Sequence, residues 1–596
     1  MEKVVNMRYK EYDTFIAETN ILDDKDKSLD DIQKKLSEFI SDDLDEDIKR
    51  LLMWEGQLFI CCEIPLEQRE DGQQFLFPQA IYTNGTKIPD IDNFEEERVT
   101  FYNHRLETVS NVTVKLRYAN YCFQYCEKNQ KYKYAMGICQ LLCEQLKNIS
   151  LGHECIVSFS RLFELSLSYS NADIIQKLDD VVYEIISREH PQENYLELLS
   201  ISRIVTGDIM NSKKEIIKEQ TKNKFINILE EMCNYYFQIK DYQLYRNCCP
   251  NYMDWLKILK RNEEIYVVLL KIGESYELSA EKEGSTNLAK AEFYQMAAWH
   301  YANIGEREKV YHLKVKIKNA FKDAASSEEF KTISTTQSIP VEQLEEETKD
   351  FFKDSVDTTL ATVSHSSDFI IDKQKIVFKA IEQAKNPLYM LVDFGHVEGN
   401  RKVFSTQNSD DVVKHITFQN YGIELEVTFS TVVNFIWNKM IAKGLTAQMV
   451  TTRICHSEYM DETQAELISI GIDRFFVEDY VSALHVLVPQ FESYFRNFFE
   501  WGGFPTTSLK SNGLQYEQNF NDFLRQDFVK ETIDTNLLFM IEYVMVEQLG
   551  KNLRNNIAHG LSDIKTFRKS NCLIVIYLFW MITSIKRRFE TENIEN

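Results

Sequence analysis

Residues with the chemistry to act on a phosphate lie close together near the C-terminus, between Arg554 and Gly560. This stretch reads Arg-Asn-Asn-Ile-Ala-His-Gly and is called the motif segment below. A guanidinium binds phosphate through a fork of N–H donors, and an imidazole exchanges protons near neutral pH. At this spacing Arg554 and His559 can therefore act together on a phosphodiester.

A second set of ionisable residues lies on a predicted helix from Glu478 to Phe499. His485, Glu492 and Arg496 interrupt an otherwise apolar pattern, and their spacing puts them within about 40° of one another on a helical wheel. They form either the solvated face of an amphipathic helix or a buried polar seam that faces the motif segment.

Positive charge gathers around the motif segment in a chain whose net charge is −24. Lys551 to Arg588 contains eight Lys or Arg residues and one acid, Asp563, which gives a local charge of +7. Such a patch attracts a phosphate-bearing partner, whereas the acidic remainder of the chain does not. The alternative is that the last three cations, Lys586 to Arg588, only flank a buried helix.

The motif segment resembles the signature of the HEPN superfamily of helical nucleotide-binding and ribonuclease domains, in which an Arg precedes a His by four to six residues. The resemblance is closest to the branch with an R-N-x-x-x-H-G motif. That motif consists here of Arg554, Asn555, His559 and Gly560. The stretch from Gly471 to Glu492, followed by Arg496, resembles the upstream helix of that branch. The likeness covers roughly the last third of the chain and is loose before it.

The resemblance implies a metal-independent endoribonuclease without a cofactor. RNA carries its own nucleophile, the 2′-hydroxyl, so the protein must supply a base, an acid and donors for the charge on phosphate. His559 is expected to transfer protons and Arg554 to bind phosphate, leaving a 2′,3′-cyclic phosphate and a 5′-hydroxyl. Asn555 either orients His559 or donates to phosphate. Glu492 either fixes the tautomer of His559 or holds Arg554 in place.

The predicted site is completed by three residues expected to bind the RNA substrate: Arg496, Asn556 and His485. The motif segment supplies one His, although cleavage needs two proton transfers. A twofold homodimer through the C-terminal domain, which is typical of HEPN domains, would bring two motif segments together. His485 is the alternative second proton carrier within one chain.

A role without catalysis stays open, because a buried Arg-Asn-His cluster can simply satisfy backbone groups where helices meet. The chain would then be an RNA- or nucleotide-binding scaffold, or a protein-interaction or membrane-surface protein. For a ribonuclease, the family suggests bacterial or antiviral defence or a regulated toxin. A protein or phage-derived trigger would then act on the helical N-terminal region.

The composition predicts that helices position these residues. With 44% hydrophobic and 27% charged residues the chain is globular, and 596 residues are too many for one core. Only 9 Pro and 19 Gly argue against a fold with many turns. We expect a mainly α protein, with a solenoid-like N-terminal region, a C-terminal HEPN-type helical bundle and a small β-hairpin at most.

Four parts are predicted: a mixed or helical region at 1–113, a domain of helical pairs at 114–325, a linker with connecting helices at 326–385, and the C-terminal domain at 386–596. The boundary near 325 rests on the Ser-, Thr- and charge-rich stretch from Ala324 to Ser338, before Pro340. An irregular helical domain is the alternative at 114–325, where no clean repeat occurs.

Short strands are predicted at Gln57–Cys62, Phe75–Tyr82, Leu388–Phe394 and Lys402–Ser405. The last two would form a hairpin around a turn at Gly395–Asn400. The segment His415–Phe429 fits a strand by its alternation and a helix by its continuation to Ala442.

The chain is expected to be cytoplasmic, without a membrane span. Met1 to Tyr12 lacks the apolar core of a signal peptide. The 12 Cys residues show no CxxC pair or zinc-like spacing, which indicates reduced thiols and no metal site. The uncharged segment Asn571–Ile585 is shorter than the roughly twenty residues of a membrane span. It is interpreted as a buried core helix, with a membrane-surface anchor as the alternative.

Overall fold

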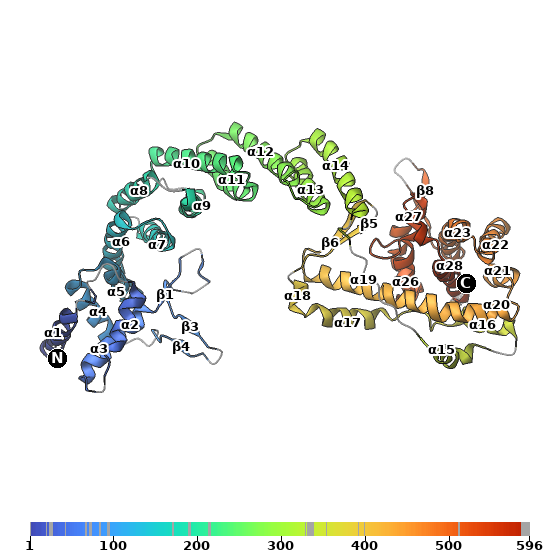
Figure 1. Ribbon diagram of the computed structural model, residues 1–596, viewed down its shortest axis with the longest axis horizontal. Helices are drawn as coiled ribbons and strands as arrows, with labels where there is room; N and C mark the ends of the chain where they lie inside the picture. The colour runs from blue at the N-terminus through green and yellow to red at the C-terminus, as the bar shows by residue number, and fades with distance from the viewer. Residues whose placement is uncertain are drawn as a thin grey trace, which may run out of the picture. The chain divides into compact units, whose positions relative to one another are not determined.

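The computed structural model describes residues 2–19, 21–22, 28–41, 43–65, 68–70, 74–82, 85–91, 96–169, 172–188, 192–212, 216–327, 329–330, 339–352, 355–390, 392–398, 400–509 and 513–585. Helices dominate, and strands are few and short (Figure 1). The prediction of a mainly α protein is confirmed. Within these ranges no helix is both long and apolar enough to cross a membrane.

The chain divides into two compact units. The N-terminal unit consists of Met1–Ser285 with Glu292–Lys314, and the C-terminal unit of Thr286–Ala291 with Val315–Asn596. Helices α13 (Asn287–Asn303) and α14 (Arg307–Ser326) contribute residues to both units. The finer division into four parts stays a prediction.

The N-terminal unit begins with helices and two small antiparallel sheets. The helices are α1 (Glu2–Thr19), α2 (Leu29–Glu38), α3 (Glu46–Phe59), α4 (Glu96–Thr108) and α5 (Val112–Tyr125). Strand β1 (Cys62–Glu63) pairs with β2 (Leu76–Phe77), and β3 (Ala80–Ile81) pairs with β4 (Lys87–Ile88). The buried Glu55 accepts hydrogen bonds from Tyr12, Tyr118 and Arg105. These donors compensate a carboxylate that is withdrawn from water.

Successive helices follow, each packed on its neighbours. They are α6 (Lys131–Asn148), α7 (His153–Tyr169), α8 (Ala172–Ser187), α9 (Tyr195–Ser212), α10 (Glu219–Gln238), α11 (Tyr242–Ile258) and α12 (Asn262–Ala280). Helix α6 packs on α7, α10 on α11, and α11 on α12 (Figure 1). Packing between neighbours in sequence is what a solenoid requires, but the solenoid itself stays a prediction.

The C-terminal unit is a helical assembly with two small hairpins. Its helices are α15 (Val341–Thr348), α16 (Val356–His365), α17 (Lys373–Ala384), α18 (Pro387–Met390), α19 (Ser409–Val427), α20 (Asn434–Ala442), α21 (Ala447–Cys455), α22 (Glu462–Phe476), α23 (Tyr480–Trp501), α24 (Phe520–Leu524), α25 (Asp527–Thr532), α26 (Thr535–Met545), α27 (Leu553–Ala558) and α28 (Lys569–Ser584). Strand β5 (Gly395–Glu398) pairs with β6 (Arg401–Ser405), and β7 (Thr507–Leu509) pairs with β8 (Gln515–Glu517).

Helix α28 lies at the centre of this unit. It is buried from Ser570 to Ile582, and α23 packs against it. The prediction of a buried core helix at Asn571–Ile585 is confirmed. The flanking cations Lys586 to Arg588 lie outside the described residues.

Two predicted strands near the middle of the chain are misplaced. The described residues of Leu388–Phe394 do not form a strand: Pro387 starts the short helix α18, which ends at Met390, and proline favours the first position of a helix. Residue 391 lies outside the described residues. The predicted turn Gly395–Asn400 instead contains strand β5. The hairpin with β6 exists, but its first strand starts seven residues later than expected.

The other short apolar runs also differ from the prediction. Of the predicted strand Gln57–Cys62, the first three residues end helix α3 and Cys62 begins strand β1, since a short apolar run fits a helix and a strand equally well. Phe75–Tyr82 contains two short strands, β2 and β3. The described residues hold four two-stranded sheets, which exceeds the expected single small hairpin.

The ambiguous segment His415–Phe429 is helical. Helix α19 continues through a π-helical turn at Thr428–Val433 into α20. Its apolar residues contact two neighbouring helices. Phe418 and Tyr421 contact aromatic side chains of α26, and Phe429 contacts the ring of Tyr577 on α28. Burial on a broad face therefore produced the strand-like pattern.

Candidate functional site

The motif segment forms the short helix α27, and a tight turn places it. A Cβ at Gly550 would lie 2.2 Å from the carbonyl oxygen of Tyr543, so only glycine fits there. The next residue, Lys551, donates its backbone N–H to the same oxygen over 2.8 Å. Asn552 then starts the helix in the left-handed conformation, with φ 47°, which Asn tolerates better than most residues. These residue types therefore encode the turn.

Helix α27 stops at the His of the motif. Gly560 has φ +64°, which favours glycine, and the N–H of Leu561 donates to the carbonyl of Asn556 over 2.7 Å. This is the hydrogen bond of a Schellman helix end. The stop leaves the His559 side chain exposed, and no described residue forms a hydrogen bond with its ring. The imidazole is thus accessible to a ligand or a second chain.

Arg554 is held by Glu492 of helix α23. Its Nε donates to Glu492 Oε2 over 2.7 Å, and its Nη2 approaches Oε1 at 3.5 Å. Its Nη1 donates to Asn555 Oδ1 over 3.0 Å. The Arg554 side chain is 27% exposed, so the guanidinium is fixed in direction and still reaches the surface. Two roles are predicted for Glu492: to fix the tautomer of His559 or to hold Arg554. The described contacts connect Glu492 with Arg554 and not with His559.

Glu492 also binds a second guanidinium, that of Arg496. The Nη2 of Arg496 donates to Glu492 Oε1 over 2.8 Å and to the carbonyl of Gln518 over 2.6 Å. Its guanidinium lies 5.6 Å from the ring of Phe520 and 5.1 Å from that of Phe523. Arg496 therefore connects α23 with the stretch from Gln518 to Phe523. Only 9% of its side chain is exposed, so it offers little surface to a substrate.

The three amides of this region form a connected set. Asn555 Nδ2 donates to Asn552 Oδ1 over 2.8 Å, and Asn552 Nδ2 donates to Asn556 Oδ1 over 3.4 Å. Asn556 Nδ2 in turn donates to the carboxylate of Glu398 on strand β5. Because Asn555 and Asn556 already have protein partners, their amides fix the turn and dock the β5–β6 hairpin on it. Neither contacts the His559 ring among the described interactions.

His485 lies two helical turns before Glu492 and faces a different neighbour. Its ring stacks on Phe567, with centroids 5.1 Å apart and planes at 14°, and its Nδ1 lies 2.8 Å from the carbonyl oxygen of Val481. The side chain is exposed. The predicted stripe on α23 is therefore split. Glu492 contacts the motif segment through Arg554, and Arg496 contacts Glu492 and the stretch from Gln518 to Phe523. No described contact connects His485 with the motif segment.

Two of the cations expected around the motif segment share one acid. Glu426 of helix α19 accepts from Lys551 over 3.0 Å, from Arg568 over 2.7 Å and from Ser570 over 3.1 Å. Burial raises the pKa of Glu426, but the cations outweigh burial and lower it below its usual value. Burial lowers the pKa of Lys551, and the charge of Glu426 acts in the opposite direction. The positive charge in this region is therefore smaller than the count of Lys and Arg residues suggests, because Lys551 and Arg568 share Glu426 and Arg554 pairs with Glu492.

Sequence reasoning missed Glu398, which contacts the motif segment, and Glu426, which contacts residues before and after it. They lie more than 120 residues before their partners, as the separations of 158 from Asn556 and 125 from Lys551 show. No local signal marks such contacts in a single sequence. The cluster of cations after residue 550 indicates that some acid must compensate it. The sequence does not show that this acid is Glu426.

The arrangement combines a guanidinium of fixed direction, which can donate hydrogen bonds to a phosphate, with one accessible imidazole, which can carry a proton. Arg554 supplies directed N–H groups, and His559 supplies an accessible imidazole. Within the described ranges there is no group of three or more His, Cys, Asp or Glu side chains placed to hold a metal ion. One such site can bind a phosphate and carry out one proton transfer.

Comparison of the chain with protein-family models, curated proteins and solved structures gives no match. The HEPN resemblance therefore stays a prediction, based on the four motif residues and on the likeness of the upstream helix.

Replacing Glu426 by Gln tests how the cations are held. The depressed pKa means that Glu426 stabilises the folded state above the usual carboxyl pKa, and that this contribution is lost as pH falls through the folded pKa. We expect Glu426→Gln to lower the free energy of unfolding at pH 7 by about 1.5–3 kcal/mol. The difference from wild type should shrink below roughly pH 4.3, in urea titrations across pH.

Glu424→Gln is the matched control, because Glu424 lies two residues before Glu426 on the same helix. Its ion pair is long, with 3.9 Å between Oε2 and the Nζ of the exposed Lys379. This variant should resemble wild type at every pH. Equal losses for both variants, or a loss for Glu426→Gln that does not depend on pH, would contradict the assigned role of Glu426.

Proposed function

We propose that the C-terminal unit is a metal-independent endoribonuclease of the HEPN type, which acts in bacterial or antiviral defence or as a regulated cytoplasmic toxin. The observation that supports this most is the Glu492–Arg554 contact, which aims a guanidinium at the surface five residues before an exposed His559. The motif resemblance supplies the reaction, and RNA is the substrate because it carries the required 2′-hydroxyl.

Arg554 keeps donors for a phosphate despite its protein contacts. A guanidinium has five N–H groups. Arg554 directs one from Nε and one from Nη2 to Glu492, and one from Nη1 to Asn555. One N–H on each terminal nitrogen remains. Two parallel donors match two oxygens of a phosphodiester and stabilise the charge that develops on them during cleavage.

The reaction is an internal transesterification. A base removes the proton of the 2′-hydroxyl, the bond from O2′ to phosphorus forms, the bond from phosphorus to O5′ breaks, and an acid protonates O5′. No water, metal or oxidant enters, and the products are a 2′,3′-cyclic phosphate and a 5′-hydroxyl. His559 provides one of the two proton transfers.

A second copy of the chain provides the other proton transfer in this proposal. Two large apolar side chains follow His559 directly and are exposed, Leu561 at 48% and Ile564 at 71%. The proposal places the dimer contact at these two side chains, because they are the exposed large apolar residues nearest to His559 in the sequence. A twofold axis at this surface would place two His559 rings and two Arg554 guanidiniums on one RNA strand. His485 is less suited, because its ring is stacked on Phe567 away from Arg554.

A binding scaffold without catalysis is the second candidate. It is favoured by the absence, among the described residues, of any carboxylate or carbonyl that orients the His559 ring. It is also favoured by Glu426, which occupies Lys551 and Arg568. In that case Arg554 would bind RNA or a nucleotide, and the chain would not cut it.

Replacing His559 by Ala tests catalysis. We expect wild-type protein to cut RNA in EDTA and His559→Ala to cut about 10²–10⁴-fold more slowly, since a general acid or base contributes that much. Arg554→Gln should reduce both RNA affinity and cleavage. His485→Ala is the matched control and should cleave like wild type. Circular dichroism would verify that each variant is folded.

Cleavage that survives in His559→Ala would exclude His559 as the proton carrier. Loss of cleavage in His485→Ala as well as in His559→Ala would favour the route within one chain. RNA binding that Arg554→Gln weakens, with no cleavage by wild type, would select the scaffold.

Replacing Ile564 by Glu tests the dimer. A charge at this exposed apolar position should separate the protomers and abolish cleavage while leaving Arg554 and His559 intact. Ile381→Glu is the control, because Ile381 is an exposed isoleucine (43%) on helix α17. Sedimentation velocity and the cleavage rate should change together for the first variant only. A monomeric wild type that cleaves RNA would exclude the shared site.

A further inference from the structure

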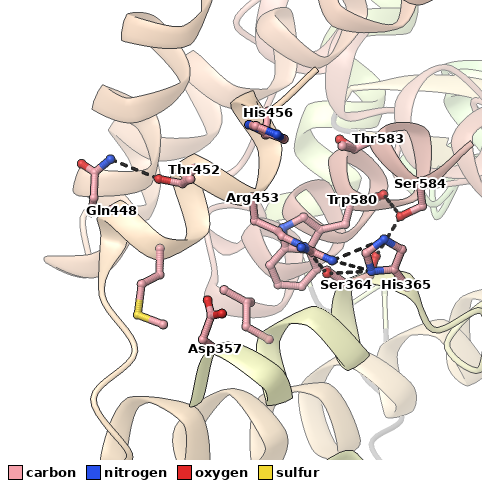
Figure 2. Close-up of a pocket in the computed structure, with 12 residues that line it drawn as sticks. Asp357, Ser364, His365, Gln448, Thr452, Arg453, His456, Trp580, Thr583 and Ser584 are labelled. Carbon is pink, nitrogen blue, oxygen red and sulfur yellow. Dashed lines mark hydrogen bonds between the residues drawn. The ribbon is translucent and has the colours of Figure 1, made fainter. Parts of the chain in front are cut away.

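The C-terminal unit contains a cavity that is separate from the motif segment. It lies between helices α16, α21 and α28 and has a volume of about 510 Å³. Figure 2 shows side chains from these helices around it, with Asp357 and His456 well separated on its wall. Cavities that hold small organic ligands usually measure about 300–1,000 Å³. This one is therefore large enough for a small metabolite, and it contains none of the residues proposed for RNA cleavage.

Arg453 reaches this cavity already fixed in position. Its Nε donates to Ser364 Oγ over 2.8 Å, and its Nη2 lies 2.6 Å from His365 Nδ1 (Figure 2). No carboxylate of the described residues forms an ion pair with it, including Asp357, which also lines the cavity. A partly buried guanidinium without an acidic partner favours an anion from outside. The Nη1 nitrogen has no described partner and is available for such a ligand.

Trp580 on the cavity wall has an unsatisfied donor. The residue is only 2% exposed, and its indole Nε1–H has no hydrogen-bond acceptor among the described residues. A buried polar group left unpaired costs about 1–3 kcal/mol. The Nε1 atom is closed off from the cavity, so an acceptor oxygen from a ligand reaches it, and removes that cost, only after neighbouring side chains shift. This observation is independent of the charge of Arg453 and indicates the same kind of partner.

The hydroxyl groups nearby do not supply that acceptor. Ser584 Oγ donates to the carbonyl of Trp580 over 2.8 Å, and Thr583 Oγ1 donates to the carbonyl of Phe579 over 2.8 Å. These groups are engaged with their own helix. Arg453 is the one Lys or Arg side chain among the described residues of the lining, so a group that only accepts hydrogen bonds complements the cavity at that residue. A phosphomonoester offers three strong acceptor oxygens and a charge of about −1.5 to −2.

We propose that this cavity binds a small phosphomonoester, whose oxygens accept from Arg453 and Trp580. Arg453 supplies the charge, and the preset contacts with Ser364 and His365 reduce the entropy lost on binding. The site goes beyond the proposed nuclease function and shares no residue with it. Failure of either leaves the other intact.

The test uses the full-length chain and two probes, inorganic phosphate and ribose 5-phosphate, with ribose as the uncharged match. Calorimetric titration should show saturable binding of both phosphates to wild type and none of ribose. Arg453→Gln should weaken binding at least about tenfold, which is the effect of losing one charge-assisted hydrogen bond. Trp580→Phe, which removes only the indole N–H, should weaken it about threefold to tenfold. Arg474→Gln on the exposed end of α22 is the control and should bind like wild type.

Three outcomes would overturn the proposal: no binding of either phosphate to wild type at 20 mM, equal binding of ribose, or unchanged binding in both Arg453→Gln and Trp580→Phe. Thermal unfolding of each variant without ligand identifies a variant that fails to fold. If Arg453→Gln fails in this way, Arg453→Lys, which keeps the charge and loses the fork, replaces it and should bind more weakly than wild type.

Discussion

The candidate site depends on one carboxylate, that of Glu492, which lies between two guanidiniums. Through Arg496 it connects helix α23 to the segment at Gln518 and Phe520, and through Arg554 it fixes helix α27. Removing one partner from a largely buried ion pair costs about 3–5 kcal/mol, because the remaining charge loses its compensation. Glu492, whose side chain is 16% exposed, would leave two such charges. The proposed catalysis and the proposed phosphate binding therefore both depend on Glu492 being in place.

The two groups needed for chemistry are held very differently. Arg554 has its direction set by Glu492 and Asn555, while the ring of His559 is exposed just before the Schellman turn at Gly560. A fixed donor with a free imidazole is half of an acid–base site. The exposed Leu561 and Ile564 beside it explain how a second copy would complete the site. The acidic chain repels RNA elsewhere, so binding would concentrate where Arg554 reaches the surface.

The local features of the site were predictable from sequence, and the distant ones were not. Gly560 at the end of α27, and the shared face of Glu492 and Arg496 on α23, follow from residue type and helical period. Glu398 and Glu426 could not be found, because tertiary packing alone brings them to Asn556 and Lys551.

The mainly α architecture followed from composition and periodicity. The strands predicted at short apolar runs such as Gln57–Cys62 and Leu388–Phe394 were misplaced, because four to seven residues do not distinguish a strand from a helix. In the second run, Pro387 favours the start of a helix.

The central claim is that this site cuts RNA by activating the 2′-hydroxyl, and the chemistry of the RNA ends tests it most directly. Purified wild-type protein would be incubated in EDTA with a mapped RNA and with the same strand carrying a single 2′-deoxy nucleotide on the 5′ side of the scissile bond. We predict 2′,3′-cyclic phosphate and 5′-hydroxyl ends from the first strand and no cut at the substituted position of the second. Cleavage at the 2′-deoxy position, or products with 5′-phosphate ends, would contradict the mechanism.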